Sequence, residues 1–539
     1  MVNADKSIKV DGLEKSIIDK CKQRIIAIAV IFFVSFITVN IKLIDISKPL
    51  KAKEYIVKDI KKLNKRGNIL DRNGNFLAVS MPTWTLKKTN DAIYNLEFTY
   101  KKILETIPNL DKVKLIKSLK SKKKQQVIAR QLTPKSAKII NKLGEPALIF
   151  EKEYLRVYPY NDQISHIVGI TGKGKDGLAG IERKYNNILN DGEDIYLTLD
   201  SRVQYKIFSI LTKGVEIYKY RGAVGIVIDV NTGELISGVS IPSFNPNAYH
   251  SIIVTPNQIT GSNFELGSVF KAITIASALN DNIITLESEF DAREPLQIGK
   301  YQIKDYHPEN RILDLEEVFI HSSNIGASLI ALELGKKRQA YYFEKLGLKN
   351  KIDSGIPEVE HPIFHSLNEI SDIHVATMSY GHGISVSPLN IVSALAATVN
   401  GGEYIRPYVV KDSKFIDRPR VRVFDERVTN IMKNLYRSNV EIGTGRNIKS
   451  SAYLVGGKTG TANKNENGRY IRNKVVSSFI SFFPINNPKY ALFVLVDEPK
   501  ATGGVLGRTP GFNAVPLSND IITEIGPILG EKTISKVEL

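Results

Sequence analysis

The sequence predicts a large α+β domain, preceded by a mixed α/β domain and one N-terminal membrane helix. Three observations lead to this prediction. An uncharged apolar run lies near the start, hairpin patterns occur at about 222–239 and 475–496, and helical patterns fill the chain between the hairpins. Strands at both ends that enclose a helical middle favour an antiparallel sheet covered by helices.

The apolar run extends from Ile25 to Ile41, 17 residues without a charge, between Arg24 and Lys42. This length reaches the lower end of what a bilayer-spanning helix needs. A signal peptide usually has a shorter apolar region and a small-x-small cleavage site, which does not follow here. A buried core helix is the other alternative. We expect one membrane anchor at 25–44 after a tail at 1–24. Lysines on both flanks leave the orientation open, so the chemistry of the body must decide whether this tail is cytoplasmic.

The composition narrows the choice of partners. The net charge is +18, which suits nucleic acid or an anionic surface. No zinc finger, RNA-recognition signature or Arg-rich arm is present, so no nucleic-acid partner is expected. The seven lysines in 112–124 fit a solvated helix face. The single cysteine, Cys21, excludes an intramolecular disulfide and a Cys-rich metal centre, and we predict no metal and no cofactor.

The body of the chain changes character at about residue 210. From 45 to 210 it mixes short strand-like runs, glycine turns and charged helical stretches, with a tight-turn signal at Asn73-Gly74. From 211 to 530 it holds the two apolar hairpins and the helical patterns between them. We therefore predict two domains with these bounds.

Ser268 and Lys271 form a Ser-x-x-Lys pair at the start of a helical pattern. The three-residue spacing places both side chains on one helix face. A serine hydroxyl is a weak nucleophile until an adjacent base takes its proton, and a buried lysine can be that base if its pKa falls toward neutrality. The spacing alone is uninformative, because Ser121 and Lys124 share it.

Two further pieces follow in order. Ser322 and Asn324 can pass protons and hold a peptide carbonyl, although the same spacing occurs elsewhere in the chain. Lys458 begins the one Lys-Thr-Gly segment, in which glycines let a ligand approach the backbone closely. Lys458 offers a cation for a carboxylate and helps to lower the pKa of Lys271. The segment contributes the following residues: Lys458, Thr459, Gly460 and Thr461.

The order Ser-x-x-Lys, Ser-x-Asn, Lys-Thr-Gly is the signature set of penicillin-binding proteins and serine β-lactamases. Ser322 follows Ser268 by 54 residues and precedes Lys458 by 136. Beyond the triplet, the chain resembles class B penicillin-binding proteins after about residue 20. The segments that carry the resemblance are 66–74, 156–159, 177–182 and 381–389. The Ser-Ser-Asn form at 322–324 resembles the division-specific, FtsI-like branch, whereas the elongation branch usually has aspartate there.

The resemblance implies a non-catalytic pedestal at 45–210 and a transpeptidase domain of the penicillin-binding-protein and serine β-lactamase type at 211–530. It implies that Ser268 attacks the D-alanyl-D-alanine bond of a wall stem peptide, with an oxyanion hole of the Ser268 and Thr461 N–H groups. Ser322 and Asn324 would assist proton transfer, and Lys458, Thr459 and Thr461 would hold the carboxylate. β-Lactams would acylate Ser268. The body would lie outside the inner membrane, where other division proteins would contact it.

Some features depart from the family pattern or imitate other sites. Leu266 stands where proline is frequent, His382 where glutamine is frequent, and 507–512 is less family-like. The segment 172–177 matches a dinucleotide-binding pattern, but its composition favours a loop over the required helix. His361 and His365 have helical spacing, but the proline between them and the missing Glu argue against zinc.

Three alternatives stay open at this stage. An elongation-specific transpeptidase would share the whole motif set. A hydrolase of the same superfamily, either a carboxypeptidase or a β-lactamase, is a second possibility, although a β-lactamase would usually lack the pedestal. A scaffold or β-lactam sensor is the third, and the intact motif triplet argues against it.

Overall fold

The computed structural model describes residues 7–47, 65–172, 176–248, 253–365, 369–411, 420–448, 453–466, 469–500 and 505–531. The chain divides into two compact units, Met1–Leu63 and Asn64–Leu539. The first unit supplies the helix α1, Ser7–Ser47. The second supplies two five-stranded sheets and the helices that pack on them.

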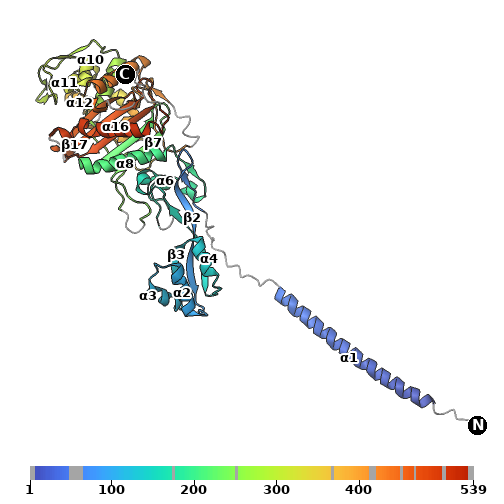
Figure 1. The fold of residues 1–539 in the computed structure, drawn as a ribbon. Coiled ribbons are helices and arrows are strands. Elements are labelled where there is room, and N and C mark those ends of the chain that lie inside the picture. Colours follow the sequence, from blue (N-terminus) through green and yellow to red (C-terminus); the bar gives the residue numbers. More distant parts are fainter. Residues whose placement is uncertain are drawn as a thin grey trace, which may run out of the picture. The chain divides into compact units, whose positions relative to one another are not determined.

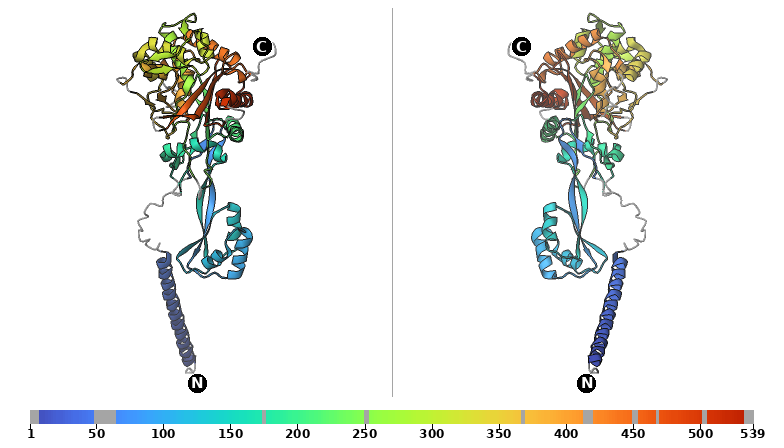
Figure 2. Two further views of the ribbon diagram at one scale, coloured as in Figure 1. Left: turned by 90° about the vertical axis from the view of Figure 1, so that its left-hand side faces the viewer. Right: turned by 90° about the vertical axis from the view of Figure 1, so that its right-hand side faces the viewer.

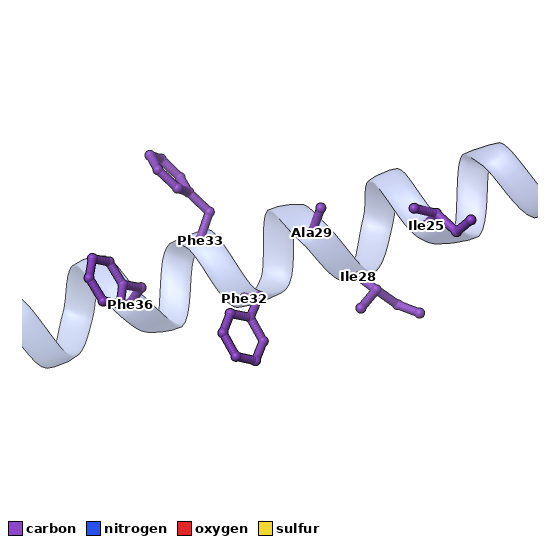
Figure 3. Close-up of a pocket in the computed structure, with 6 residues that line it drawn as sticks. All are labelled: Ile25, Ile28, Ala29, Phe32, Phe33 and Phe36. Atoms are coloured by element: carbon purple, nitrogen blue, oxygen red, sulfur yellow. The ribbon is translucent and has the colours of Figure 1, made fainter.

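Helix α1 contains the apolar run that the sequence singled out. Its segment Asp19–Leu43 is 25 residues long and apolar enough to cross a membrane, and within the described residues it is the one helix of this kind. At 1.5 Å per residue, such a segment is about 37 Å long, enough for a hydrocarbon core of about 30 Å. Figure 3 shows Ile28, Phe32 and Phe36 projecting from this helix into the surroundings. The expected anchor at 25–44 lies within α1.

The first sheet of the large unit is built by the segment that the sequence assigned to the pedestal. Its order is β3-β2-β1-β5, and β4 pairs with β2. The strands are β1 Ile69–Leu70, β2 Phe76–Thr89, β3 Gln125–Leu132, β4 Leu148–Val157 and β5 Ile195–Tyr196. Gly74 adopts a φ of +84° between β1 and β2, which confirms the predicted tight turn.

Three helices close one lobe of this region (Figure 1): α2 Leu96–Thr106, α3 Lys112–Leu119 and α4 Pro134–Asn141. They bury Ile103, Leu115 and Ile140 with Leu86 of β2. The lysine-rich helix is shorter than the predicted 112–124. Because the apolar positions end at the buried Leu119, the lysines that follow have no apolar partner that would extend the helix.

A buried ion cluster links residues near the start of the first sheet's region, 65–200, to residues near its end. Glu182 is fully buried and accepts from Arg66 Nε at 2.7 Å and from Arg156 Nε at 2.6 Å. Tyr158 also donates to Glu182, at 3.2 Å. Arg66 lies just before β1, Arg156 is in β4, and Glu182 is in α6, Gly180–Lys184. One carboxylate therefore holds two arginines from distant parts of the chain.

The second sheet has the order β16-β17-β18-β6-β7, and each neighbouring pair is antiparallel. Its strands are β6 Gly222–Asp229, β7 Leu235–Ile241, β16 Gly456–Glu466, β17 Arg469–Phe483 and β18 Tyr490–Asp497. Both predicted hairpins are present: β6–β7 is the first, and β17–β18 the second. They pair through β6 and β18, in which Asp229 and Tyr490 are partners although they are 261 residues apart, so both segments lie inside the sheet and have buried-strand patterns.

Helices cover both faces of this sheet (Figures 1 and 2). On one face α8, Ser201–Tyr218, and α16, Ala514–Ile525, pack against Val227, Phe479 and Val494. The other face contributes to the core that holds the remaining helices: α9 Phe270–Asn280, α10 Leu315–Ile320, α11 Asn324–Lys345, α12 Asp372–Ser379, α13 Pro388–Ala396 and α15 Glu426–Glu441. These layers agree with the predicted α+β arrangement.

The short strands form two-stranded pairs outside the main sheets. They are β8 Glu289–Asp291 with β11 Ile312–Asp314, β9 Leu296–Ile298 with β10 Tyr301–Ile303, β12 Ile363–Phe364 with β13 Ile384–Ser385, and β14 Glu403–Tyr404 with β15 Val421–Arg422. The expected boundary at residue 210 falls inside α8. Since α8 buries its apolar side against β7 and α16, we propose that the catalytic domain begins with this helix.

The buried ion cluster generates a stability prediction. Glu182→Gln keeps the shape of the side chain but leaves the buried Arg66 and Arg156 without a counter-charge. Removing one partner of such a cluster should lower the free energy of unfolding by about 3–5 kcal/mol. Urea unfolding followed by circular dichroism measures the change.

The control for this variant is Glu153→Gln. Glu153 pairs with the exposed Arg130 at 3.2 Å on the protein surface. Its loss should change the free energy of unfolding by less than about 1 kcal/mol. Equal destabilisation by the two substitutions would contradict the role assigned to the cluster.

Candidate active site

Ser268 and Lys271 lie where a tight turn leads into a buried helix. Ser268 is in the 3-10 turn η2, Gly267–Val269, and Lys271 is in the first turn of α9. Every residue of α9 from Phe270 to Leu279 is buried, so this helix crosses the core. Ser268 is half-buried, whereas Lys271 is completely buried. The pair predicted from its spacing therefore occupies the turn at which a core helix begins.

Ser322 and Asn324 lie at the start of α11. Ser322 has a φ of +59°, a left-handed conformation that is strained for serine. Ser323 caps the helix, because its hydroxyl accepts from the Gly326 N–H at 2.9 Å. The strained residue turns the chain between α10 and α11, and this turn carries the Ser322 side chain toward Lys271.

One serine hydroxyl connects the two buried lysines. Lys271 Nζ lies 3.1 Å from Ser322 Oγ, and Lys458 Nζ lies 2.9 Å from the same atom. Lys271 also donates to Asn324 Oδ1 at 2.8 Å and to the Ser322 carbonyl. The three motifs thus meet around Ser322 Oγ, although Ser322 is 51 residues from Lys271 and 136 residues from Lys458 in the sequence.

The two lysines cannot easily both be charged. Burial lowers the pKa of Lys271 well below its ordinary value, and the nearby Lys458 lowers it further, whereas Asp305 raises it. Burial alone lowers the pKa of Lys458 to about 7. A buried ammonium beside another ammonium is unfavourable, and the uncharged amine is favoured instead. An uncharged Lys271, one turn from Ser268, can accept a proton from its hydroxyl.

Strand β16 approaches the Ser268 turn so closely that glycine is required on both sides. Gly267 has a φ of +62°, and a Cβ added there would clash with the carbonyl of Thr461. A Cβ at Gly460 would clash with the carbonyl of Leu266. Gly381, with a φ of +79°, abuts the Gly267 carbonyl in the same way. Backbone contact without side chains therefore places the Ser268 turn against the sheet edge.

The hydroxyl groups predicted on β16 lie on one side of that strand. Thr461 is exposed, whereas Thr459 is buried and shares a 2.6 Å hydrogen bond with the Thr444 hydroxyl. Thr444 in turn donates to Asn439 at 3.0 Å. Since alternate residues of a strand point the same way, Thr459 and Thr461 face the same side.

Sequence reasoning missed several groups of this site. Thr444 belongs to no motif, and neither does Asp305, which accepts from Ser323 Oγ at 2.7 Å. Lys271 lies 6.0 Å from the centre of the Tyr380 ring. Tyr380 directly precedes the segment 381–389. The family resemblance of that segment could therefore have pointed to Tyr380. Asp305 and Thr444 had no comparable signal, because neither has a motif around it.

His382, one of the departures from the family pattern, lies beside two tyrosines. Its ring centre is 5.3 Å from that of Tyr380 and 5.7 Å from that of Tyr470. Burial lowers the pKa of His382 to about 4, so the ring is neutral at physiological pH. Tyr470 donates to Glu265, three residues before Ser268, at 3.2 Å.

Two segments, 172–177 and 361–365, match the sequence patterns of other kinds of site. Gly172 and Gly177 lie outside any helix, and the described part of their segment forms an isolated bridge between Thr171 and Gly177. Residues 173–175 of the dinucleotide-like pattern lie outside the described residues. His365 contacts the ring of His374 with 4.3 Å between centres. Among the described residues, no group of three or more His, Cys, Asp or Glu is arranged to hold a metal.

Comparison with protein families gives two matches. Residues 223–522 match the penicillin-binding protein transpeptidase domain, and residues 61–196 match the penicillin-binding protein dimerisation domain. The chain is 34% identical to the probable peptidoglycan D,D-transpeptidase FtsI of Caulobacter vibrioides, over 87% of this chain and 82% of that protein. It is 28% identical to the peptidoglycan D,D-transpeptidase FtsI of Escherichia coli, over 84% and 82%.

Solved structures show the same fold. A penicillin-binding protein 2X from Streptococcus thermophilus aligns with a TM-score of 0.74 at 20% identity, covering 88% of this chain and 81% of that one. Penicillin-binding protein 3 from Mycobacterium, in complex with aztreonam, aligns with a TM-score of 0.68 at 19% identity, over 88% and 98%. The predicted resemblance and fold class are confirmed.

The glycine contact at the Ser268 turn generates a prediction about reactivity. In Gly267→Ala the new Cβ must displace the Thr461 carbonyl, and the turn shifts. Penicillin acylation should slow by roughly 100-fold or more, because a displacement of about 1 Å near the reacting atoms can cost this much. Stopped-flow measurement of acylation tests this.

Gly299→Ala is the matched control. Gly299 also has a left-handed φ, +55°, but a Cβ added there meets nothing within 4 Å. The substitution carries the same backbone strain of about 1–2 kcal/mol without the clash. Its acylation rate should stay within about twofold of wild type, and an equal loss in both variants would show that the contact with β16 is unimportant.

Proposed function

Because this chain belongs to the class B penicillin-binding proteins of the FtsI type, we propose that Ser268 is the nucleophile of a peptidoglycan D,D-transpeptidase that works at the division septum. The observation that supports this assignment is the contact of Lys271 and Lys458 with one hydroxyl, that of Ser322. This arrangement supplies an uncharged buried amine one turn from Ser268.

In the first half-reaction, Ser268 Oγ attacks the carbonyl of the penultimate D-alanine of a stem peptide. Lys271 takes the hydroxyl proton, and the N–H groups of Ser268 and Thr461 stabilise the oxyanion. The carbon–nitrogen bond then breaks, and the proton passes from Lys271, with the help of Ser322, to the departing D-alanine. An ester on Ser268 remains.

In the second half-reaction, the amine of a neighbouring stem peptide attacks this ester. The amine loses a proton to the uncharged Lys271 as the new carbon–nitrogen bond forms. The ester bond breaks, Ser268 Oγ regains a proton from Lys271, and the cross-linked peptide leaves. Asn324 holds the Lys271 amine in place throughout, because its Oδ1 accepts from Nζ at 2.8 Å.

The edge of the sheet provides a binding surface for the extended stem peptide. β16 pairs with β17 on one side, and it is the terminal strand of the five-stranded sheet. Its outer edge therefore offers backbone N–H and C=O groups with which an extended peptide can pair. Thr459, Thr461 and Thr444 line one side of this strand and hold the terminal carboxylate, together with the positive charge of Lys458.

The cellular setting is part of the proposal. With α1 as a single-pass anchor in the cytoplasmic membrane, the large unit lies on the outer side, where wall peptides are found. The Ser-Ser-Asn form at 322–324 and the FtsI names of the relatives support the septal role over the elongation role. Other division proteins are the partners that a septal enzyme needs.

Ser268→Ala should abolish covalent labelling by a fluorescent penicillin, because the acyl acceptor is lost. Labelling of membranes from cells that express each variant, followed by gel electrophoresis, measures this. Ser121→Ala is the control, since Ser121 has the same Ser-x-x-Lys spacing and should remain dispensable. Persistent labelling of the Ser268 variant, or no labelling of wild type, would overturn the assignment.

The septal role has its own test. Depletion of the protein should produce filaments, because elongation continues while septum synthesis stops. Wild type should restore division, and Ser268→Ala should not. Cells that become round on depletion would instead favour the elongation role, with the acyl-transfer assignment intact.

A further inference from the structure

The loop after β10 contacts the start of α11 through Asp305. Asp305 Oδ1 accepts from the Ile325 N–H at 3.0 Å and from the Asn324 N–H. Asp305 Oδ2 accepts from Ser323 Oγ at 2.7 Å. One half-buried carboxylate thus binds three consecutive residues, two of which belong to the Ser-x-Asn motif.

The neighbouring residue fixes the orientation of the Asn324 amide. Asn324 Nδ2 donates to the Lys304 carbonyl at 2.9 Å, and Oδ1 accepts from Lys271 Nζ at 2.8 Å. An amide flipped by 180° would place two acceptors, Oδ1 and the Lys304 carbonyl, against each other. The backbone of 304–305 therefore keeps the acceptor end of Asn324 directed at Lys271.

The carboxylate also acts through its charge. From β16, Lys458 faces Lys271 with a positive charge, and from the end of α12 the Tyr380 ring lies 6.0 Å away. Ser322 and Asn324 offer neutral oxygens, and His382 is neutral. Asp305 is the negative group that acts on Lys271, and it raises the pKa that burial and Lys458 lower.

We propose that Asp305 is a positioning residue that holds Asn324 against Lys271 and offsets, by its negative charge, the repulsion between the two buried lysines. This inference rests on the proposed function, in which Lys271 is the base. Without Asp305, Lys271 would lose its proton at a lower pH, and the Asn324 amide would be less well oriented. Both effects act on Ser268 through Lys271.

A purely structural role has a different consequence. Asp305 could simply cap α11, since carboxylates stabilise helix N-termini. Loss of a cap would lower stability and reduce the rate at every pH by the same factor. Loss of a charge near the base would move the pH at which the rate reaches half its maximum. The pH profile therefore separates the two roles.

The experiment measures the second-order rate of penicillin acylation by the full-length protein between pH 4.5 and 9. Wild type should lose activity toward acid, as Lys271 becomes protonated. In Asp305→Asn the midpoint of this acid limb should fall by roughly half a unit or more, since a nearby opposite charge shifts a pKa by about one unit or more. The maximal rate should fall by about tenfold. Asp305→Glu should restore the midpoint.

Two variants serve as controls. Glu309→Gln removes a carboxylate from the same loop, but Glu309 pairs with His321 and Arg311, so its midpoint should match wild type. Ser323→Ala removes a hydrogen bond of Asp305 and a cap of α11 but keeps the charge. It should lower the rate without moving the midpoint. Thermal melting of each variant confirms that it is folded.

The outcomes are distinct. An unchanged or higher midpoint in Asp305→Asn would overturn the inference, as would equal shifts in Asp305→Asn and Glu309→Gln. A flat wild-type profile would also overturn it, because the charge of Asp305 would then have no titrating base to adjust. Loss of labelling in Ser268→Ala under any of these outcomes would leave the proposed function standing.

Discussion

The contact of two buried lysines with one serine hydroxyl is the constraint on which the rest of the catalytic domain depends. An ammonium group in the protein interior is costly, and two at hydrogen-bonding distance from a single oxygen are more so. The structure meets this cost with the acceptors of Ser322 and Asn324 and the charge of Asp305, and burial lowers the pKa of Lys271 well below its ordinary value. In the proposed mechanism the same cost makes Lys271 the base, so the burial that destabilises its charge also provides its reactivity.

The fold of the domain is arranged to keep this contact in place. α9 is buried from Phe270 to Leu279 and places Lys271 in the core. Ser322 and Asn324 lie at the start of α11, and Lys458 lies in β16. These elements come from three distant parts of the chain. Their approach depends on positions without side chains, Gly267 and Gly460, because any Cβ would separate the Ser268 turn from the sheet edge. Close packing of the backbone thus positions the side chains to which the proposed reaction is assigned.

The amino-terminal part of the large unit also buries charged side chains, and there they have a structural role. Glu182 gathers Arg66 and Arg156 in a buried cluster, just as Asp305 compensates the lysines of the active site. In the cluster, hydrogen bonds hold both arginines on one carboxylate, and one positive charge remains in excess. In the active site two lysines share one hydroxyl, and burial lowers the pKa of both. Arginine keeps its proton in proteins, whereas a buried lysine can lose it, and this difference separates the structural cluster from the site proposed for catalysis.

The sequence by itself was enough to predict the chemistry that we propose for this protein. Its three motifs predicted Ser268, Lys271, Ser322 and Lys458, its hairpin patterns predicted the sheet, and its apolar run predicted α1, because each signal is local. Only the tertiary structure decided the electrostatic environment. Asp305, Thr444 and the position of α8 against the sheet depend on contacts between segments with no shared pattern. Such contacts arise from packing, and local spacing cannot encode which carboxylate will face a buried amine.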